Sequence, residues 1–382
     1  MKENNPDYIL IWIVGFLIIL GILILSSTSF TVSQEKFGNT FYYLTHQLIF
    51  GFVPGIILAF IFFKIPIIRL KKTSFILLIF NLFLMGLVFA PKIGVTIRGA
   101  SRWISLGPFV FQPSELLKVT FILYLADWLS NRSSSLKGNF FAKKRTALMP
   151  QSNHRANKTL IAFLMIIGLV ALFLVLQPDV STLGIIAMIS LILYFLAGAP
   201  FWHVILMTLM GISALFALIK IAPYRMARFL VFLQPEISPL GIGYHLQQAL
   251  IALGSGGLTG VGLGLSRQRF GFLPSVMSDS VFAVFAEETG FIGALILIVL
   301  FLLFFIRGFR ISKNAADPFL QLAGFGITSW ITIQAFINIG AMTRILPLTG
   351  IPLPFISYGG SAIVVELIGV GILLNISKYS KI

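Results

Sequence analysis

Three carboxylates stand in a short stretch of this sequence that is otherwise strongly apolar. Residues 273–290 read LPSVMSDSVFAVFAEETG, with Asp279 just before a long apolar run and Glu287 and Glu288 about two helical turns inside it. A partly desolvated carboxylate is a better proton acceptor than a fully hydrated one, so Asp279 is a candidate general base. It could instead cap the helix that follows. The deeper pair is expected to be neutralised by Lys or Arg from neighbouring helices.

A second polar group lies in RGASRWISLGPFVFQPSELLKV, residues 98–119. Arg98 and Arg102 carry planar guanidinium groups that suit phosphate oxygens. Trp103 fits either a stacking platform for a sugar or an anchor at the membrane surface. These residues are therefore candidates for binding a phosphorylated sugar, and interfacial anchoring is the alternative.

The same stretch contains an ionisable pair at helical spacing. Pro113 can occupy the first turn of a helix, and Glu115 and Lys118 then lie three residues apart on one face. Charged residues inside a membrane helix suggest a binding function, although a purely structural ion pair fits equally well.

A third group lies in PYRMARFLVFLQP and the glycine-rich segment after it. Arg225 and Arg228 are one helical turn apart and could together bind a pyrophosphate, or could anchor the chain at the membrane surface. The glycines of residues 254–264 do not form a P-loop, because the closing Lys-Ser/Thr is missing. Close backbone packing or a turn explains them.

The composition indicates what kind of protein must position these groups. Of 382 residues, 58% are hydrophobic and 10% are charged, with a mean hydropathy of +0.98, which indicates a polytopic membrane protein. The chain has no cysteine and four scattered histidines, so disulfides, thiol nucleophiles and a histidine-based zinc site are not expected. The net charge of +16 lies between apolar runs and does not indicate nucleic-acid binding.

The expected fold is all-α, because only helices satisfy their own backbone groups in lipid. Apolar windows long enough to cross a bilayer occur about ten times. We expect one domain over residues 1–382, with spans at 8–28, 42–63, 73–91, 113–131, 159–176, 180–198, 201–221, 281–306, 318–341 and 353–375.

Lys and Arg are roughly twice as frequent on one side of these spans as on the other, which predicts that both termini are cytoplasmic. Residues 132–158 then form a basic, flexible inner loop near anionic lipid headgroups. Residues 222–280 form a large outer loop between spans seven and eight, and we expect it to carry function.

Four segments in order resemble one known family. RWISLGPFVFQPSELLK, QPDVST at 177–182, the tract 224–290 and LPLTGIPLPFISYGG at 346–360 are similar to signature segments of the FtsW/RodA/SpoVE (SEDS) family. Members of this family are peptidoglycan polymerases of the bacterial cytoplasmic membrane. The resemblance implies a glycosyltransferase that joins lipid II units on the outer face. Its partners would be a class B penicillin-binding protein and other division or elongation proteins.

The resemblance also suggests roles for particular residues. An aspartate of the outer loop is essential in the family and corresponds to Asp279, and the Trp of the Arg-Trp pair corresponds to Trp103. The wording SRQRFGFLP and FAVFAEETGFIG is more similar to FtsW, which implies a role in division at the septum, with a RodA-like elongation role as the alternative.

This sequence departs from the family pattern around the aspartate. Where family members commonly read LPE-x-HTDF, this chain has LPSVMSDS, so Ser275, Met277, Ser278 and Ser280 replace Glu, His, Thr and Phe. In addition, His245 stands where Gln is usual. Ser181 stands where Gly is usual.

The expected mechanism uses Asp279 to take the proton of the acceptor hydroxyl. Arg102, Arg225 and Arg228, or a divalent cation, would neutralise the pyrophosphate leaving group. No cofactor is evident in the sequence, and no metal site is identifiable. Two rival functions are a flippase for lipid II and a division scaffold without catalytic activity.

Overall fold

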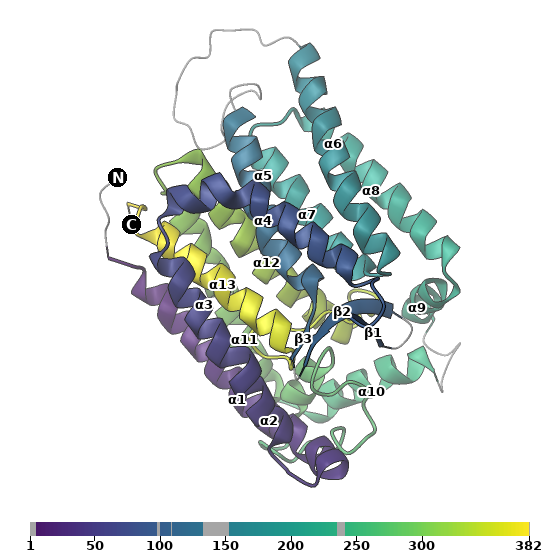
Figure 1. Ribbon diagram of the computed structural model, residues 1–382. Coiled ribbons are helices and arrows are strands. Elements are labelled where there is room, and N and C mark those ends of the chain that lie inside the picture. Colours follow the sequence, from purple (N-terminus) through teal and green to yellow (C-terminus); the bar gives the residue numbers. More distant parts are fainter. Residues whose placement is uncertain (1–4, 98–99, 108, 133–152, 235–240, 382) are drawn as a thin grey trace.

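The computed structural model describes residues 5–97, 100–107, 109–132, 153–234 and 241–381. Its elements follow the predicted order of membrane helices (Figure 1). The helices are α1 (Tyr8–Phe37), α2 (Tyr42–Gln47), the π-helical η1 (Leu48–Phe52), α3 (Val53–Lys64), α4 (Ile67–Leu87), α5 (Pro113–Arg132), α6 (Asn153–Leu176), α7 (Val180–Leu196), α8 (Phe201–Ile221), α9 (Pro223–Leu233), α10 (Ile242–Ser255), α11 (Val281–Lys313), α12 (Pro318–Met342) and α13 (Gly360–Ser377).

The protein is a polytopic helical membrane protein. Within the described residues, eight helices are long and apolar enough to cross a bilayer, and α7 is a shorter apolar helix. The predicted span 113–131 corresponds to α5, which is largely buried even though it carries Glu115 and Lys118. Each predicted span therefore has a helical counterpart, with α2, η1 and α3 together forming the second.

The two ends of the chain lie together at one end of the helix bundle (Figure 1). The Ser377 hydroxyl of α13 accepts a hydrogen bond from the Asp7 amide at 3.0 Å. Arg307, near the end of α11, pairs with the Asp7 carboxylate at 2.7 Å. Both termini are thus on the same side, as the charge distribution predicts.

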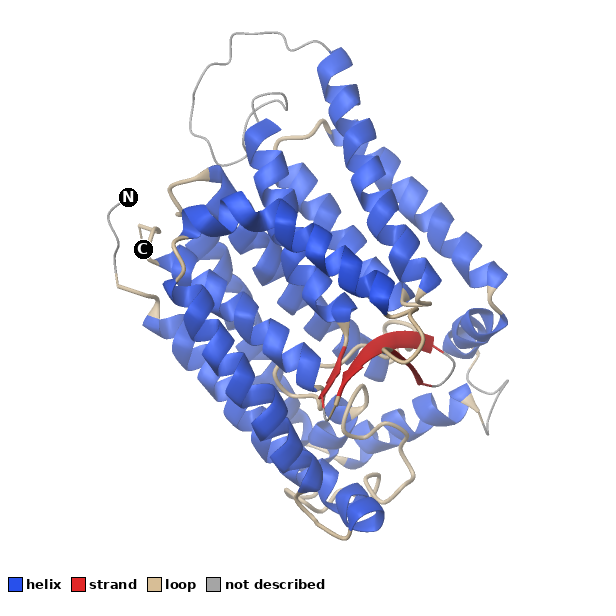
Figure 2. Ribbon diagram, viewed as in Figure 1, coloured by secondary structure: helices blue, strands red, loops and turns tan. Residues whose placement is uncertain are grey.

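A small sheet lies near the opposite end of the bundle, where Figure 2 shows it in red. Strands β1 (Gly94–Ile97), β2 (Ala100–Leu106) and β3 (Phe109–Phe111) form it in the order β1-β2-β3. Both pairings are antiparallel. The all-helical prediction missed this sheet, because strands this short leave little alternation to detect between long apolar windows.

The outer segment 222–280 is partly helical, with α9 and α10 on the same end of the bundle as the sheet (Figure 1). After α10, a glycine-rich turn packs directly on the backbone of α11. The amides of Val261 and Gly262 donate to the carbonyls of Glu287 and Glu288, both at 3.0 Å. The close-packing interpretation of these glycines is therefore confirmed.

The same contact interrupts α11 at Gly290, which has φ 69° and ψ −168°. The amides of Phe291 and Ile292 donate to the carbonyls of Gly257 and Leu258 at 2.9 and 3.1 Å. The outer part of α11, which follows Asp279, is thus held by the outer segment as well as by the bundle.

Several predicted boundaries differ from the structure, as at the end of α1, which extends to Phe37, and two of the differences concern irregular segments. The last helix begins at Gly360 and not at 353, because prolines at 347, 352 and 354 keep residues 346–359 irregular. The predicted inner loop 132–158 lies largely outside the described residues, and its end is already helical because α6 begins at Asn153.

Candidate functional site

Asp279 lies in a turn whose backbone is held in place by hydrogen bonds from the core of the protein. Three successive carbonyls of this turn accept hydrogen bonds from α12 and from the irregular segment before α13. Tyr358 N donates to Met277 O at 2.7 Å, Ser357 Oγ to Ser278 O at 2.5 Å and Asn338 Nδ2 to Asp279 O at 2.8 Å. Fastened backbone of this kind holds a side chain in a fixed position, as catalysis requires.

The Asp279 side chain is half-buried and retains unused acceptor capacity. Among the described residues its carboxylate has one hydrogen-bond donor, the Ser278 hydroxyl at 3.0 Å. The N-cap residue of α11 is Ser280, and no side-chain cap bond is formed there. The alternative role of Asp279 as a helix cap is therefore not what the structure shows.

His245 of α10 lies beside this turn, with Nε2 2.6 Å from the Ser280 hydroxyl. Burial lowers the pKa of His245 below its ordinary value, whereas the charge of Asp279 raises it and the charge of Arg228 lowers it. Arg228 and Asp279 are thus both within electrostatic reach of this ring. Sequence reasoning noted His245 only as a departure from the family pattern, because no local signal connects residues this far apart.

The predicted clamp of two arginines is not formed as expected. Arg225 donates to the Tyr224 hydroxyl at 2.9 Å and to the Leu218 carbonyl at 3.0 Å. Its guanidinium therefore ties α9 to the end of α8. Arg228 is the member of the pair whose charge acts on His245, which is hydrogen-bonded to the Asp279 turn. The spacing of one helical turn places the two residues on one face of α9, but it does not determine which groups they contact.

Arg102 also differs from its expected role as a free phosphate donor. Its Nε donates to Gln177 O at 2.9 Å, its Nη2 donates to Pro178 O, and its Nη1 lies 3.9 Å from Asp179. All three guanidinium nitrogens thus face the turn between α6 and α7. Arg102 fastens the sheet to that turn.

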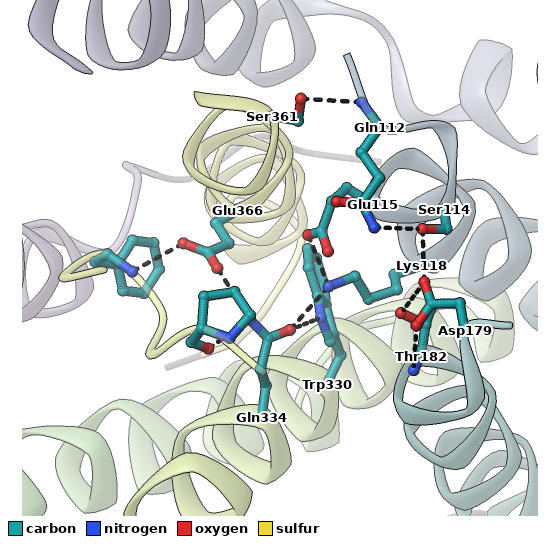
Figure 3. A network of polar contacts seen from close by, with 12 residues as sticks. Gln112, Ser114, Glu115, Lys118, Asp179, Thr182, Trp330, Gln334, Ser361 and Glu366 are labelled. Atoms are coloured by element: carbon teal, nitrogen blue, oxygen red, sulfur yellow. Dashed lines mark hydrogen bonds and ion pairs between the residues drawn. The ribbon is translucent and has the colours of Figure 1, made fainter. Parts of the chain in front are cut away.

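Asp179 holds the turn between α6 and α7 in place through hydrogen bonds. Its carboxylate caps α7 by accepting from Thr182 N at 3.3 Å, and it also accepts from the Ser114 hydroxyl at 2.9 Å (Figure 3). The next residue but one, Ser181, donates to Thr349 O at 2.7 Å. The QPDVST segment therefore connects α5, α7 and the segment that leads to Gly350.

Trp103 lies in β2 opposite Val95 of β1 and is partly exposed. It is therefore accessible at the end of the bundle that carries the sheet, as a stacking platform requires. Arg98, the other predicted donor of this region, lies outside the described residues.

The Glu115–Lys118 ion pair predicted from helical spacing is confirmed. Lys118 Nζ lies 2.7 Å from Glu115 Oε2, and both side chains are buried. Figure 3 shows the pair facing Gln334 of α12, whose Oε1 accepts from Lys118 at 2.9 Å and from the Trp330 indole at 2.9 Å. The predicted pair is therefore part of a larger buried network.

The network continues to Glu366 of α13, which sequence reasoning did not single out. Gln334 Nε2 lies 3.3 Å from Glu366 Oε1, and the Phe355 amide donates to Glu366 Oε2 at 2.8 Å. A carboxylate inside the apolar run AIVVELIGV was the available signal. Through Phe355, this network supports the segment that also holds the Asp279 turn.

The expected Lys or Arg partners of Glu287 and Glu288 are not what the structure shows. Glu287 accepts from the Ser266 hydroxyl and from the Arg267 amide, the latter at 3.1 Å. Glu288 accepts from the Ser27 hydroxyl at 2.5 Å. Both acids are thus stabilised by hydroxyl and amide donors, which satisfy a buried carboxylate without an ion pair.

The residues that the structure describes include no cluster of three or more His, Cys, Asp or Glu that could hold a metal ion. The groups around Asp279 are instead the His245 imidazole and the hydroxyls of Ser278 and Ser280, and the charge of Arg228 acts on the imidazole. This arrangement suits proton transfer next to an anionic ligand.

Comparisons with known proteins agree over nearly the whole chain. The FtsW/RodA/SpoVE family model, described as "Cell cycle protein", matches residues 8–382. Stage V sporulation protein E of Bacillus subtilis (strain 168) is 36% identical over 380 residues, covering 100% of this chain and 99% of that protein. The probable peptidoglycan glycosyltransferase FtsW of Coxiella burnetii (strain RSA 493 / Nine Mile phase I) is 36% identical over 368 residues, covering 96% and 94%.

A solved structure shows the same architecture. It is described as structural coordination of polymerization and crosslinking by a peptidoglycan synthase complex, and it superposes with a TM-score of 0.72 and 27% identity over 97% of each chain.

Proposed function

We propose that this chain, which belongs to the FtsW/RodA/SpoVE family, is a peptidoglycan glycosyltransferase that polymerises lipid II on the outer face of the bacterial cytoplasmic membrane. Family membership over residues 8–382 and a relative named as a probable peptidoglycan glycosyltransferase support this activity. The observation that carries the proposal is the Asp279 turn, which is fastened at three carbonyls while its carboxylate retains acceptor capacity.

Asp279 acts as the general base in this proposal. Its carboxylate takes the proton of the acceptor sugar hydroxyl, and the hydroxyl oxygen forms a bond to the anomeric carbon of the donor. The bond from that carbon to the pyrophosphate oxygen breaks, and its electron pair leaves with the pyrophosphate. Attack from the face opposite the leaving group inverts the anomeric carbon.

Arg228 is the protein cation that we assign to the pyrophosphate, because its charge acts on His245, which is hydrogen-bonded to the turn that carries Asp279. Arg102 is assigned to positioning, since its guanidinium already faces the turn between α6 and α7. Trp103 is assigned to sugar contact. A separate proposal is that a divalent cation assists Arg228 in neutralising the pyrophosphate. Measuring polymerisation with and without a chelator tests it.

The polyprenyl tail of the substrate requires an apolar groove that faces lipid. A cavity of about 460 Å³ between α4 and α6 has only apolar and glycine lining, including Leu82, Phe83 and Phe173. The adjacent carbonyl of Met85 accepts from Gln177 at 2.9 Å, so the groove lies next to the turn that Arg102 fastens. We assign the tail to this groove.

We further propose a class B penicillin-binding protein as partner and the division septum as location. The similarity to a chain of a peptidoglycan synthase complex supports such a partner, and the relative named FtsW supports division over elongation. Localisation of a tagged copy tests this choice, because a midcell band fits division and side-wall patches fit elongation.

Polymerisation by the purified protein with lipid II, alone and with its partner, tests the function. The Asp279→Asn variant is expected to be inactive, and Glu35→Gln is the matched control because Glu35 is an exposed carboxylate in the last turns of α1. A flippase would translocate lipid II without forming glycan. A scaffold would keep its cellular role in the Asp279→Asn variant. Either result would contradict the proposal.

A further inference from the structure

A hydrogen-bonded histidine connects the outer helix α10 to the turn that carries Asp279. His245 lies in the first turn of α10, and its Nε2 is 2.6 Å from Oγ of Ser280. Ser280 directly follows Asp279 and is the N-cap residue of α11. Asn338, Ser357 and Tyr358 hold this turn from α12 and the segment before α13, and His245 holds it from α10.

The hydrogen bonds determine which nitrogen of His245 carries the proton. The Ser280 hydroxyl has one proton, which it donates to the Pro274 carbonyl at 2.8 Å. The hydroxyl must therefore accept from His245, so Nε2 is the protonated nitrogen and Nδ1 carries the lone pair of the neutral ring. Nδ1 has no hydrogen-bond partner in the described part of the chain, so an added proton would enter there.

Two opposite charges act on this ring from the elements around α10. One is the carboxylate charge of Asp279, in the turn before α11, and the other is the guanidinium charge of Arg228, in α9. Burial lowers the pKa of His245 below the ordinary 6.5, Asp279 raises it, and Arg228 lowers it. The net shift is downward, so the ring gains a proton at a lower pH than a free imidazole does.

We propose that His245 is a positioning residue for the polymerase reaction, and that protonation of its ring switches the reaction off. The proposal rests on the polymerase function given above. Neutral His245 donates to Ser280 and keeps the Asp279 turn in place, while the Asp279 carboxylate remains available to the acceptor hydroxyl. Protonated His245 is a cation beside that carboxylate, which it would attract in competition with the substrate.

Arg228 makes the switch sharper. A protonated His245 would carry a positive charge, which repels the Arg228 guanidinium whose charge acts on this ring. Protonation therefore disturbs both the proposed base and the proposed cation for the pyrophosphate. The device uses four side chains from three elements: Arg228 of α9, His245 of α10, and Asp279 and Ser280 at the start of α11.

The first experiment measures polymerisation of lipid II by the full chain with its partner between pH 5 and pH 8. A rate that requires a neutral imidazole falls about tenfold for each pH unit below the pKa of the ring. His245→Gln keeps an N–H donor near the Nε2 position but does not titrate. This variant is expected to retain most of the parental rate at pH 7.5. Its rate should not show the decrease at acid pH that the parental protein shows.

His245→Ala removes the donor, and we expect a rate reduced about tenfold at every pH, since misplacement of a catalytic group lowers rate without abolishing it. Ser280→Ala removes the acceptor and should give a similar loss. The double variant should be no slower than either single variant, because both changes break one interaction. Glu35→Gln should keep the parental profile.

The second experiment is independent of activity and follows the histidine ring by NMR in isotope-labelled protein. The resonance that disappears in His245→Gln identifies His245. Asp279→Asn should lower its pKa, because it removes the carboxylate that favours the charged ring. Arg228→Ala should raise it, because it removes a like charge.

The outcomes separate this inference from the proposed function. If His245→Gln keeps the parental decrease in rate at acid pH, or if the His245 resonance does not respond to Asp279→Asn and Arg228→Ala, the switch is overturned. If the parental protein makes no glycan at any pH with its partner present, the proposed function is overturned. In that event the NMR titration still decides whether His245 and Asp279 are coupled.

Discussion

Asn338 of α12 donates one hydrogen bond to the carbonyl of Asp279 at 2.8 Å and another to the carbonyl of Ile351 at 2.7 Å. A single amide group in the core thus joins the turn before α11 to the irregular segment before α13. Asn338 is 1% exposed, so water cannot replace it at either carbonyl. The position of the proposed base is therefore set from the centre of the bundle.

Asn338→Ala is expected to lower stability and polymerisation together. Each buried carbonyl left without its donor costs about 1–3 kcal/mol, and the freed turn no longer holds Asp279 in place. Thermal unfolding in detergent and the polymerisation rate measure the two effects. Thr343→Ala is the matched control, because Thr343 lies at the same end of α12 and bonds only within its own helix. Parental activity in the Asn338 variant would contradict this role.

Asp279→Asn is expected to fold and insert normally and to lose polymerisation by about 10² to 10⁴-fold, the usual contribution of a general base. The amide has nearly the same shape and can still accept from the Ser278 hydroxyl. Equal membrane accumulation of the two proteins, followed by a glycan assay, checks both parts. A variant that polymerises at a rate close to the parental one would remove Asp279 from the mechanism.

Arg228→Ala is expected to weaken use of lipid II more than Arg225→Ala. The charge of Arg228 acts on His245 beside the Asp279 turn, whereas Arg225 is bonded to Tyr224 and Leu218. We expect a loss of about tenfold or more in kcat/KM for Arg228→Ala, as a charged hydrogen bond to phosphate is worth about 1.5–3 kcal/mol. Lys143→Ala in the predicted inner loop should have no effect on lipid II use. Equal losses of kcat/KM in the two arginine variants would contradict this assignment and support a clamp formed by both arginines.

Lys118→Met is expected to destabilise the protein by about 3–5 kcal/mol, because it leaves Glu115 buried without its partner. The double variant Lys118→Met with Glu115→Gln should recover much of this loss, since it removes the unpaired charge. Thermal unfolding tests both changes, with Lys313→Met as a control for loss of an exposed lysine. No recovery in the double variant would show that the pair is not the source of the effect.

Gly260→Ala is expected to disrupt the contact between the glycine-rich turn and α11. Gly260 has φ 83°, and a Cβ there would lie 2.1 Å from the Glu288 carbonyl oxygen. The left-handed backbone alone costs about 1–2 kcal/mol for alanine, and the clash adds to it. Gly254→Ala is the control, because Gly254 lies in α10 with no atom within 4 Å of its Cβ position. Similar unfolding temperatures for both variants would contradict the packing role.

The sequence by itself determined the membrane class, the approximate spans and the common side of the two termini. These properties follow from continuous apolar length and from the distribution of Lys and Arg, both of which are local in the chain. It also determined the Glu115–Lys118 pair, because residues three apart on a helix must be neighbours. Asp279 could be singled out because a carboxylate beside an apolar run needs an explanation.

Only the tertiary structure decided what these residues contact. Arg102 was predicted as a phosphate donor, but its partners lie 75 and 76 residues further along the chain. Gln334 joins Lys118 across 216 residues, and His245 meets Ser280 across 35. Propensity and periodicity contain no information about such distances. Packing of α5 against α12, of α10 against α11 and of the sheet against the turn before α7 brings these polar groups together, since a buried donor or acceptor must find a partner wherever the fold supplies one.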